Sequence, residues 1–555
     1  MNRPFVRLVR HFFLRLFDVD LGSSEGRLGV GAVLGILNVP GALMSMVLFA
    51  KYSSLLRWIR RDFQFDPDIA SLPDKYTFLA FSIAATGIIA ILRLESLFPD
   101  RRDYFNLGPL PVSMRTILLA KVTALAGFVL LFVVDVNLVS SVLFPLIVME
   151  DHGTFTEALR FIAAHVAAVT AAGIWTFCAA LALTGTLMTV LPCAVFRRIR
   201  RYVQFVAVAG LLILFLSASG MRFELANVRA GNPTILEWLP PAWFLGLYQE
   251  VQGKSVGSFA ALSLFGLKAL LVTSVLALAA YGSSYRWFFL RSAETPEGSA
   301  AAFRVPEWLF RWLDAYALRS GFERASLRFI LRTLARSDRH IGMLAAICGL
   351  GLALAVQSAT NTGANEPVPL GILAAALIMV YSVLTGLRLS FGLPAELQAN
   401  WILRMASDDT ADPQPVVRLA MYILLLPPVV IPALVFAIAF SPVIAFWHSV
   451  FAIAASSVLV ELLISGFRVI PFTCSWLPGR QNMVLAVAVW GGGVLVFGHG
   501  LAAIEAFLLL ELWRFSIFLC VVAGVLYGLG YVRAVREPLA WSDTRGDLDL
   551  LRLTE

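Results

Sequence analysis

Ionisable side chains are rare inside the long apolar stretches of this sequence, and in a membrane such residues are the first candidates for a function. Asp135 and Asn137 lie together in the apolar segment LLFVVDVNLVSS. A carboxylate beside an amide can bind a cation or a polar headgroup. Near the outer end of a span a carboxylate can stay hydrated, and the free-energy cost of placing it there is small. A merely structural role therefore fits equally well. We therefore treat the two residues as candidates for a cargo or ion path.

The remaining chemical groups predict no catalytic centre. Glu461, Glu505 and Glu511 with Arg514 lie at or near the ends of apolar runs, where interfacial anchoring or local pairing is expected. The six histidines lack HxxxH spacing, although His165 and His499 merit a test in a coupling assay. The five cysteines form no CxxC or CxxH pair, so neither a disulfide framework nor a metal site is expected.

The sequence lacks the HExxH motif of zinc-dependent hydrolases, which argues against that class of enzyme. Residues 253–255 read Gly-Lys-Ser, like the end of a phosphate-binding loop, but Tyr248 occupies the place of the required earlier glycine. We expect no cofactor bound by this chain, and any ATP-driven work needs a partner.

The elements that position these groups are predicted to be membrane-spanning helices. The chain has 555 residues, of which 59% are hydrophobic and 14% charged, with a mean hydropathy of +0.80. This composition excludes a water-soluble globule and predicts an all-α, polytopic membrane protein. Twelve apolar runs are predicted spans: 28–50, 76–92, 116–138, 165–192, 202–219, 260–283, 341–358, 369–389, 418–440, 446–464, 483–504 and 514–532.

Positive charge predicts the orientation. The net charge is +8, and most Lys and Arg residues flank apolar runs, where they face lipid headgroups rather than a nucleic acid. The positive-inside rule places both termini in the cytoplasm of a bacterial-type inner membrane. Loop 51–75 is basic yet falls outside in this arrangement, although its four aspartates partly offset the misfit.

The chain divides into two sets of six spans. We predict a first half at 1–290, a cytoplasmic linker at 291–340 and a second half at 341–555. A basic amphipathic interfacial helix is expected before each half, at 3–17 and along the stripe Arg324, Arg328, Arg332 and Arg336. An internal duplication explains this repeat, and so does the ordinary basic character of cytoplasmic linkers.

Three loops are informative. Residues 97–121 hold a charged and proline-stiffened element suited to receiving a push from a docked protein, with an ordinary re-entry turn as the alternative. The corresponding loop 393–418 places a tryptophan among charged residues, which suits a protein contact and equally an interfacial anchor. Residues 236–249 (LEWLPPAWFLGLYQ) are expected to form an external cap or a re-entrant hairpin. The candidates are Arg101, Arg102, Asp103, Pro109, Pro111 and Arg115 in the first loop, Glu396, Trp401 and Arg404 in the second, and Trp238, Pro240, Pro241, Trp243 and Phe244 in the third.

In this order, the basic opening helix, the FPDRRD…LPVS…LAK loop after span two and the LPPAWF element before span six resemble the permease subunit of type-2 ABC exporters, in the long form that fuses two six-span halves. The resemblance implies a separate cytoplasmic ABC ATPase, in two copies, which carries the ATP and Mg and docks beneath 97–115 and 393–404. The second half departs from the pattern because no second LPVS…K sequence follows span eight.

The resulting expectation is a non-enzymatic permease subunit that exports an apolar or amphipathic cargo such as a lipid, drug or lipopeptide. Membrane lipids are expected partners, nucleic acid is not, and a homodimer stays open. The alternatives are a secondary transporter driven by a proton or sodium gradient, a membrane-embedded lipid-modifying enzyme, and a non-transporting membrane anchor. The secondary transporter predicts intramembrane carboxylates in both halves, and Asp135 has no evident counterpart in the second half.

Overall fold

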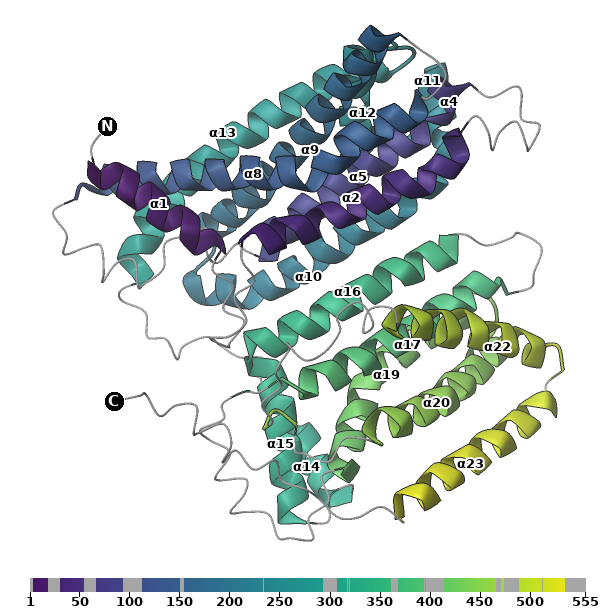
Figure 1. Cartoon of the computed structure of the whole chain (residues 1–555). Coiled ribbons are helices and arrows are strands. Elements are labelled where there is room, and N and C mark those ends of the chain that lie inside the picture. Colours follow the sequence, from purple (N-terminus) through teal and green to yellow (C-terminus); the bar gives the residue numbers. More distant parts are fainter. Residues whose placement is uncertain are drawn as a thin grey trace. The chain divides into compact units, whose positions relative to one another are not determined.

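The computed structural model describes most of the chain as two compact units, unit 1 (Met1–Ala300) and unit 2 (Ala301–Glu555). Within the described residues every regular element is a helix and none is a strand (Figure 1). The described residues are 3–17, 30–53, 66–92, 112–149, 154–232, 234–292, 307–316, 318, 320–360, 368–393, 395, 414–465, 471–473, 489–511 and 513–534.

Ten helices of the described chain are long and apolar enough to cross a membrane. The number rises to eleven if Tyr202–Ser217 and Arg222–Ala230, which meet at an angle of 79°, count as one broken span. The protein therefore has the helices of a polytopic membrane protein, while twelve spans stay a prediction. A helix also forms at the first predicted span, but it is not among the ten.

Unit 1 is a bundle in which helices distant in sequence pack together. Helix α9 packs against α5, α8, α12 and α13, and α2 packs along α8. Its elements are α1 (Arg3–Phe17), α2 (Val30–Tyr52), α4 (Pro67–Ala70), α5 (Leu72–Leu92), α8 (Met114–Val148), α9 (Phe155–Val190), α10 (Cys193–Ser217), η1 (Ala218–Gly220), α11 (Arg222–Ala230), η2 (Ile235–Trp238), α12 (Pro240–Gln252) and α13 (Phe259–Ser292).

Helices α8 and α9 are longer than the predicted spans, with 35 and 36 residues. The added turns are packed rather than solvated, since the rings of Phe144 and Phe161 are buried against each other with centroids 5.9 Å apart. The new start of α9 is fixed by Glu157, whose carboxylate accepts a hydrogen bond from the backbone N–H of Thr154 at 2.8 Å. The extension of α9 contains Glu157 and Arg160 and is less hydrophobic than the predicted span, whereas the extension of α8, VSSVLFPLIV, is apolar and was left out of the predicted span.

The amphipathic segment 3–17 is helix α1, and it packs against α8. Phe12 is buried on this contact, and the Lys121 ammonium lies 5.4 Å from the centroid of its ring. The predicted helix is therefore present, with part of its apolar stripe turned toward a neighbouring helix. Its position at a membrane surface stays a prediction.

The connection between α10 and α13 is a folded element of its own. After η1 the chain bends into α11, and Gly231 ends that helix with a left-handed φ of 80°. The prolines Pro240 and Pro241 then begin α12, which packs against α5, α9 and α13. This element, residues 218–258, is called the cap of unit 1 below. It gives the unit a helical cover at the end where α8 is joined to α9.

Unit 2 is a second helical bundle, centred on α17. This helix packs against α16, α19, α20, α22 and η5, so most of its length is buried. The elements of the unit are α14 (Glu307–Tyr316), α15 (Gly321–Arg336), α16 (Asp338–Thr360), α17 (Leu370–Phe391), α19 (Gln414–Ala439), α20 (Pro442–Ile464), η5 (Val494–Gly500), α22 (Leu501–Leu509) and α23 (Trp513–Ala534).

Helix α15 shows the stripes expected from the sequence. The Ser320 hydroxyl caps its start by accepting a hydrogen bond from the backbone N–H of Glu323 at 3.1 Å, and the Glu323 carboxylate accepts one from the backbone N–H of Ser320 at 3.2 Å. On its basic face, Arg328 pairs with Asp314 of α14 at 2.5 Å. Its apolar face is buried in the core of unit 2 and consists of Leu327, Ile330, Leu331 and Leu334. The amphipathic pattern thus serves packing within the unit.

A π-helical segment, η5, leads directly into α22. It approaches α17 so closely that a Cβ atom at Gly498 would lie 2.5 Å from Cγ1 of Ile378. Glycine at this position permits the contact. The helix after α22, α23, follows after a short connection, so unit 2 has no described counterpart of the cap between its last two helices.

Candidate functional site

Most candidates for coupling to an ATPase lie outside the described residues. These are Arg101, Arg102, Asp103, Pro109 and Pro111 in the first loop, and Glu396, Trp401 and Arg404 in the second. Arg115 is described, and it lies exposed in the first turn of α8. Ser113 caps this turn by accepting a hydrogen bond from the backbone N–H of Thr116 at 3.3 Å. The first candidate loop therefore leads straight into a capped helix of 35 residues.

Asp135 and Asn137 of α8 face different neighbours. Oδ1 of Asp135 accepts a hydrogen bond from Nδ2 of Asn38 on α2 at 2.8 Å, and its other carboxylate oxygen is buried without a hydrogen-bond partner. Nδ2 of Asn137 donates to the hydroxyl of Ser82 on α5 at 3.0 Å. The amide thus joins two helices, and the two candidates do not converge on one ligand position.

The cap candidates divide into buried and exposed residues. Phe244 is fully buried, and Trp243 packs edge-on against Trp175 of α9 and Phe265 of α13, with centroids 5.6 and 4.8 Å away. Trp238 is 80% exposed, which suits a group at the headgroup level. Residues 236–249 therefore form most of the 3-10 turn η2 and the larger part of α12, which packs against α9 and α13, with one projecting tryptophan.

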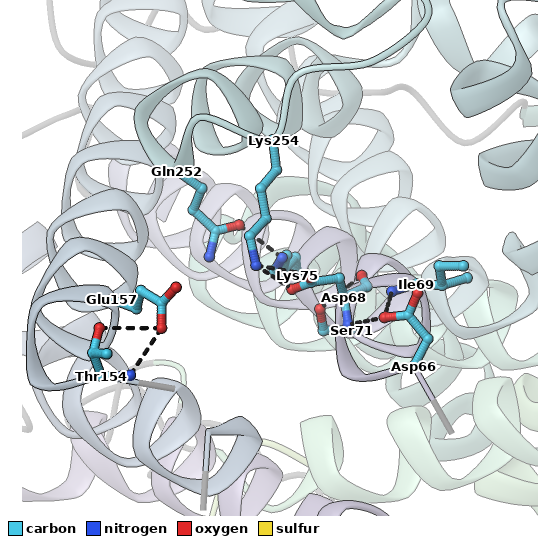
Figure 2. A network of polar contacts seen from close by, with 9 residues as sticks. All are labelled: Asp66, Asp68, Ile69, Ser71, Lys75, Thr154, Glu157, Gln252 and Lys254. Atoms are coloured by element: carbon cyan, nitrogen blue, oxygen red, sulfur yellow. Dashed lines mark hydrogen bonds and ion pairs between the residues drawn. The ribbon is translucent and has the colours of Figure 1, made fainter. Parts of the chain in front are cut away.

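Lys75 forms the centre of a polar network beneath the cap (Figure 2). Its side chain is fully buried, and its ammonium donates to Oε1 of Gln252 on α12 at 2.8 Å. The same ammonium lies 4.9 Å from the ring centroid of Phe161 and 5.3 Å from that of Tyr248. Two aromatic faces and one amide thus replace the water that a lysine normally keeps.

The rim of this network is more exposed. Lys254, which follows α12, pairs with Asp68 of α4 at 2.6 Å, and both side chains are about half exposed. Asp66 caps α4 by accepting from the backbone N–H of Asp68 at 2.9 Å. Figure 2 shows Gln252 and Lys254 reaching from the cap toward the segment that carries Asp66, Asp68 and Lys75. The cap is therefore held to α4 and α5 by one buried and one exposed lysine.

A second buried contact fixes α12 to α9. The Tyr248 hydroxyl lies 2.9 Å from Nδ1 of His165, and both side chains are fully buried. Burial raises the pKa of the Tyr248 hydroxyl well above its ordinary value, so the group stays neutral. The rings of Phe78 and Phe144 lie against the same imidazole, with centroids 5.4 and 5.5 Å away. These contacts describe a structural histidine in an aromatic cluster.

In unit 2 the structure pairs two ionisable residues inside candidate spans. Nδ1 of His448 on α20 lies 2.7 Å from Oε1 of Glu505 on α22. The side chains are 1% and 0% exposed. From the sequence we expected Glu505 to anchor an interface or to pair locally, and no role was assigned to His448. The partner of Glu505 lies 57 residues away in sequence, so no local pattern could have revealed the pair.

Unit 2 holds two further polar contacts between its helices. Glu461 near the end of α20 binds Arg418 of α19, with 2.5 Å between Oε1 and Nε. His499 of η5 lies with Nε2 3.2 Å from the hydroxyl of Ser358 on α16. Among the described residues no group of three His, Cys, Asp or Glu side chains is placed to hold a metal ion. The arrangement is suited to holding charge and protons inside a helical bundle.

Comparisons with models of protein families, with curated proteins and with solved structures found no match to this chain. The functional argument therefore depends on the geometry of the two units and on the sequence.

Proposed function

We propose that this chain is the transmembrane permease subunit of an ATP-driven exporter. A separate ABC ATPase, in two copies, hydrolyses ATP, and this chain moves an apolar or amphipathic cargo such as a lipid, drug or lipopeptide across a bacterial-type inner membrane. The chain itself breaks no bond in the cargo.

The observation that carries the proposal is the cap of unit 1. In the permeases that this chain resembles, the LPPAWF element lies before the sixth span, and here it joins η2 to α12, the helix directly before α13. Trp243 and Phe244 pack against Trp175 of α9. A cap of this kind covers one end of a bundle while the opposite end stays available to a motor protein.

Force from the motor has a direct route into unit 1. The loop with Arg101 and Arg102 precedes the capped start of α8, and a helix of 35 residues transmits a push over its whole length. Helix α1 packs along α8 and α2 does the same, so these helices move together as one body. In this mechanism ATP binding shifts such bodies between inward-facing and outward-open states.

The test is a charge reversal in the first loop. We expect Arg101→Glu with Arg102→Glu to abolish co-purification of an ABC ATPase encoded beside this gene, or to abolish its cargo-stimulated ATP hydrolysis, without loss of membrane insertion. Arg222→Glu with Arg229→Glu, on α11 of the cap, is the matched control and should retain both properties. Unchanged ATPase binding and hydrolysis in the first variant, or chemical conversion of a substrate by the purified chain alone, contradicts the proposal.

A gradient-driven secondary transporter is the second candidate. It is favoured by one observation, the carboxylates inside the candidate spans of both units, Asp135 in unit 1 and Glu505 in unit 2. Proteoliposomes that hold this chain alone separate the candidates. Transport that a proton or sodium gradient drives without ATP, and that Asp135→Asn or Glu505→Gln abolishes, supports the second candidate.

A further inference from the structure

Three of the carboxylates inside the candidate spans, Asp135, Glu461 and Glu505, have partners of different chemistry. Asp135 faces an amide, that of Asn38, and Glu461 faces the guanidinium of Arg418, which keeps its charge at every physiological pH. Glu505 faces the imidazole of His448. Histidine ordinarily changes its charge between about pH 5 and 8. Of the three pairs, the third is therefore the one in which both members can gain or lose a proton.

The His448–Glu505 pair is closed off from water. Both side chains are at least 99% buried, because their exposed fractions are 1% and 0%. The ring of Phe436 on α19 covers the imidazole edge-on, with centroids 4.5 Å apart. Oε2 of Glu505 is buried without a hydrogen-bond partner. A donor that arrives when the site opens would satisfy that oxygen, and a proton on the carboxyl group would remove its negative charge.

Relative to a neutral imidazole beside a carboxylate, the closed His448–Glu505 pair can hold one added proton for electrostatic reasons. With one proton shared, the pair is neutral overall, whether the imidazole or the carboxylate carries it. A second proton, or the loss of the first, leaves a full unpaired charge in a medium of low dielectric constant, which is strongly unfavourable. The number of protons on the pair can therefore change only after the site has opened to water.

Among the described side chains of the elements packed against α20 and α22, we find no other charged group in contact with His448 or Glu505. The charged and titratable groups of these elements contact other partners, project from α23 or lie half-buried on α19. They are Arg418 with Glu461, Arg388 with the carbonyl of Leu463, Tyr381 with the carbonyl of Trp490, His499 with Ser358, Arg514 with Glu511, the exposed Cys520, Tyr527 and Tyr531 of α23, and Tyr422 of α19.

The route to water is short on one side. His448 follows Pro442, the first residue of α20, by about 9 Å along the axis, and Glu505 precedes Leu509, the last residue of α22, by about 6 Å. The α19–α20 and α22–α23 connections lie at these helix ends, where Glu511 is exposed. Protons can therefore reach the pair from the side of these two connections.

A π-helical segment lies next to the carboxylate. The turns of η5 precede α22 directly, and π-helical turns are rare and occur frequently at functional sites. Conversion of η5 to an α-helix changes the register of α22 and turns Glu505 away from His448. The hydrogen bond between His499 and Ser358 ties η5 to α16, so the same movement is felt by a third helix.

We propose that His448 and Glu505 form a proton-binding site in unit 2. The pair holds one proton while α20 and α22 are closed, and it exchanges protons with water on the side of the α19–α20 connection when α22 shifts. This inference depends on the geometry of unit 2 and applies whether ATP or a gradient drives transport.

The test is infrared difference spectroscopy of the full chain in lipid nanodiscs, between pH values about two units on either side of the ordinary histidine pKa. We expect the wild type to show a carboxyl band that changes with pH. Glu505→Gln should remove that band, and Glu461→Gln, which alters the carboxylate beside an arginine, should keep it. A band of equal size in wild type and Glu505→Gln overturns the proposal, as does a wild type without any pH-dependent carboxyl band.

A second variant keeps the test valid if Glu505→Gln does not fold. His448→Gln preserves a hydrogen-bond donor for Glu505 but removes the titratable partner, so the carboxyl group should remain protonated over the same range and its band should no longer change with pH. A His448→Gln protein whose carboxyl band still follows pH as in the wild type contradicts a shared proton.

Discussion

Units 1 and 2 differ in the connection between their last two long helices. They also differ in the surroundings of a fully buried ionisable residue. In unit 1 the connection from α10 to α13 is the folded cap, and the buried Lys75 lies beneath it. In unit 2 the connection from α22 to α23 is short, and Glu505 is buried between helices. The cation of unit 1 is enclosed by aromatic rings, whereas the carboxylate of unit 2 has a titratable partner. The comparison sets a packed cover in unit 1 against the proposed proton-binding pair in unit 2.

The largest expected effect comes from removing the anchor of the cap. Phe244→Ala deletes a fully buried ring, and we expect it to lower the free energy of unfolding of the cap by about 3–5 kcal/mol. Hydrogen–deuterium exchange should show faster exchange in α12 and the start of α13, with α20 and α22 unchanged. Trp238→Ala is the control, since that side chain is 80% exposed. Equal protection of α12 in both variants would show that the cap is not held by its buried ring.

A comparison of two glycines tests whether close packing differs between the units. A Cβ atom at Gly246 would lie 2.5 Å from backbone atoms of Phe259 and Ser263, whereas one at Gly524 of α23 would meet no atom within 4 Å. We expect Gly246→Val to lower the stability of the cap by about 3 kcal/mol and Gly524→Val to leave unit 2 unchanged. Thermal unfolding in micelles measures both. A fully tolerated Gly246→Val would mean that α12 is not docked on α13.

Lys75→Met tests whether the buried lysine fastens the cap. The substitution leaves the Gln252 amide without its donor, and we expect a loss of about 2 kcal/mol, read from exchange in α12. The double variant Lys75→Met with Gln252→Met removes both polar groups and should recover part of that loss. Additive losses in this double-mutant cycle would contradict a direct interaction.

The smallest predicted effect concerns the hydroxyl of Tyr248. Tyr248→Phe keeps the ring that faces Lys75 but removes the hydrogen bond to His165, so we expect a loss of about 1 kcal/mol in cap stability. His165→Phe offers an apolar replacement in the same aromatic cluster. The combined variant should be no less stable than Tyr248→Phe, because no polar group is then left unsatisfied. A combined loss larger than either single loss would show that the imidazole has another partner.

The sequence predicted elements whose signal is local. The basic and apolar stripes of α15 and the amphipathic α1 follow from spacing along one helix, and the ten candidate spans follow from hydrophobic runs. The sequence did not predict the burial of Lys75, because its acceptor Gln252 lies 177 residues away. From the sequence, we considered Lys75 only as part of the basic loop 51–75. Pairing across such distances is decided by packing, which periodicity along a single helix does not encode.

The lengths of α8 and α9 have a consequence for the profile of unit 1 in a bilayer. At about 1.5 Å per residue, a 36-residue helix extends about 54 Å, against a hydrocarbon thickness of about 30 Å. Even tilted by about 40°, it still rises about 41 Å, so about 11 Å protrudes beyond the hydrocarbon region. Because α12 of the cap packs on α9 and Arg160 near the start of α9 donates to the carbonyl of Val251, a protrusion at this end would be a knob covered by the cap. Such a knob would give electron-microscopy images of this small membrane protein a landmark for alignment, and a raised epitope for antibodies.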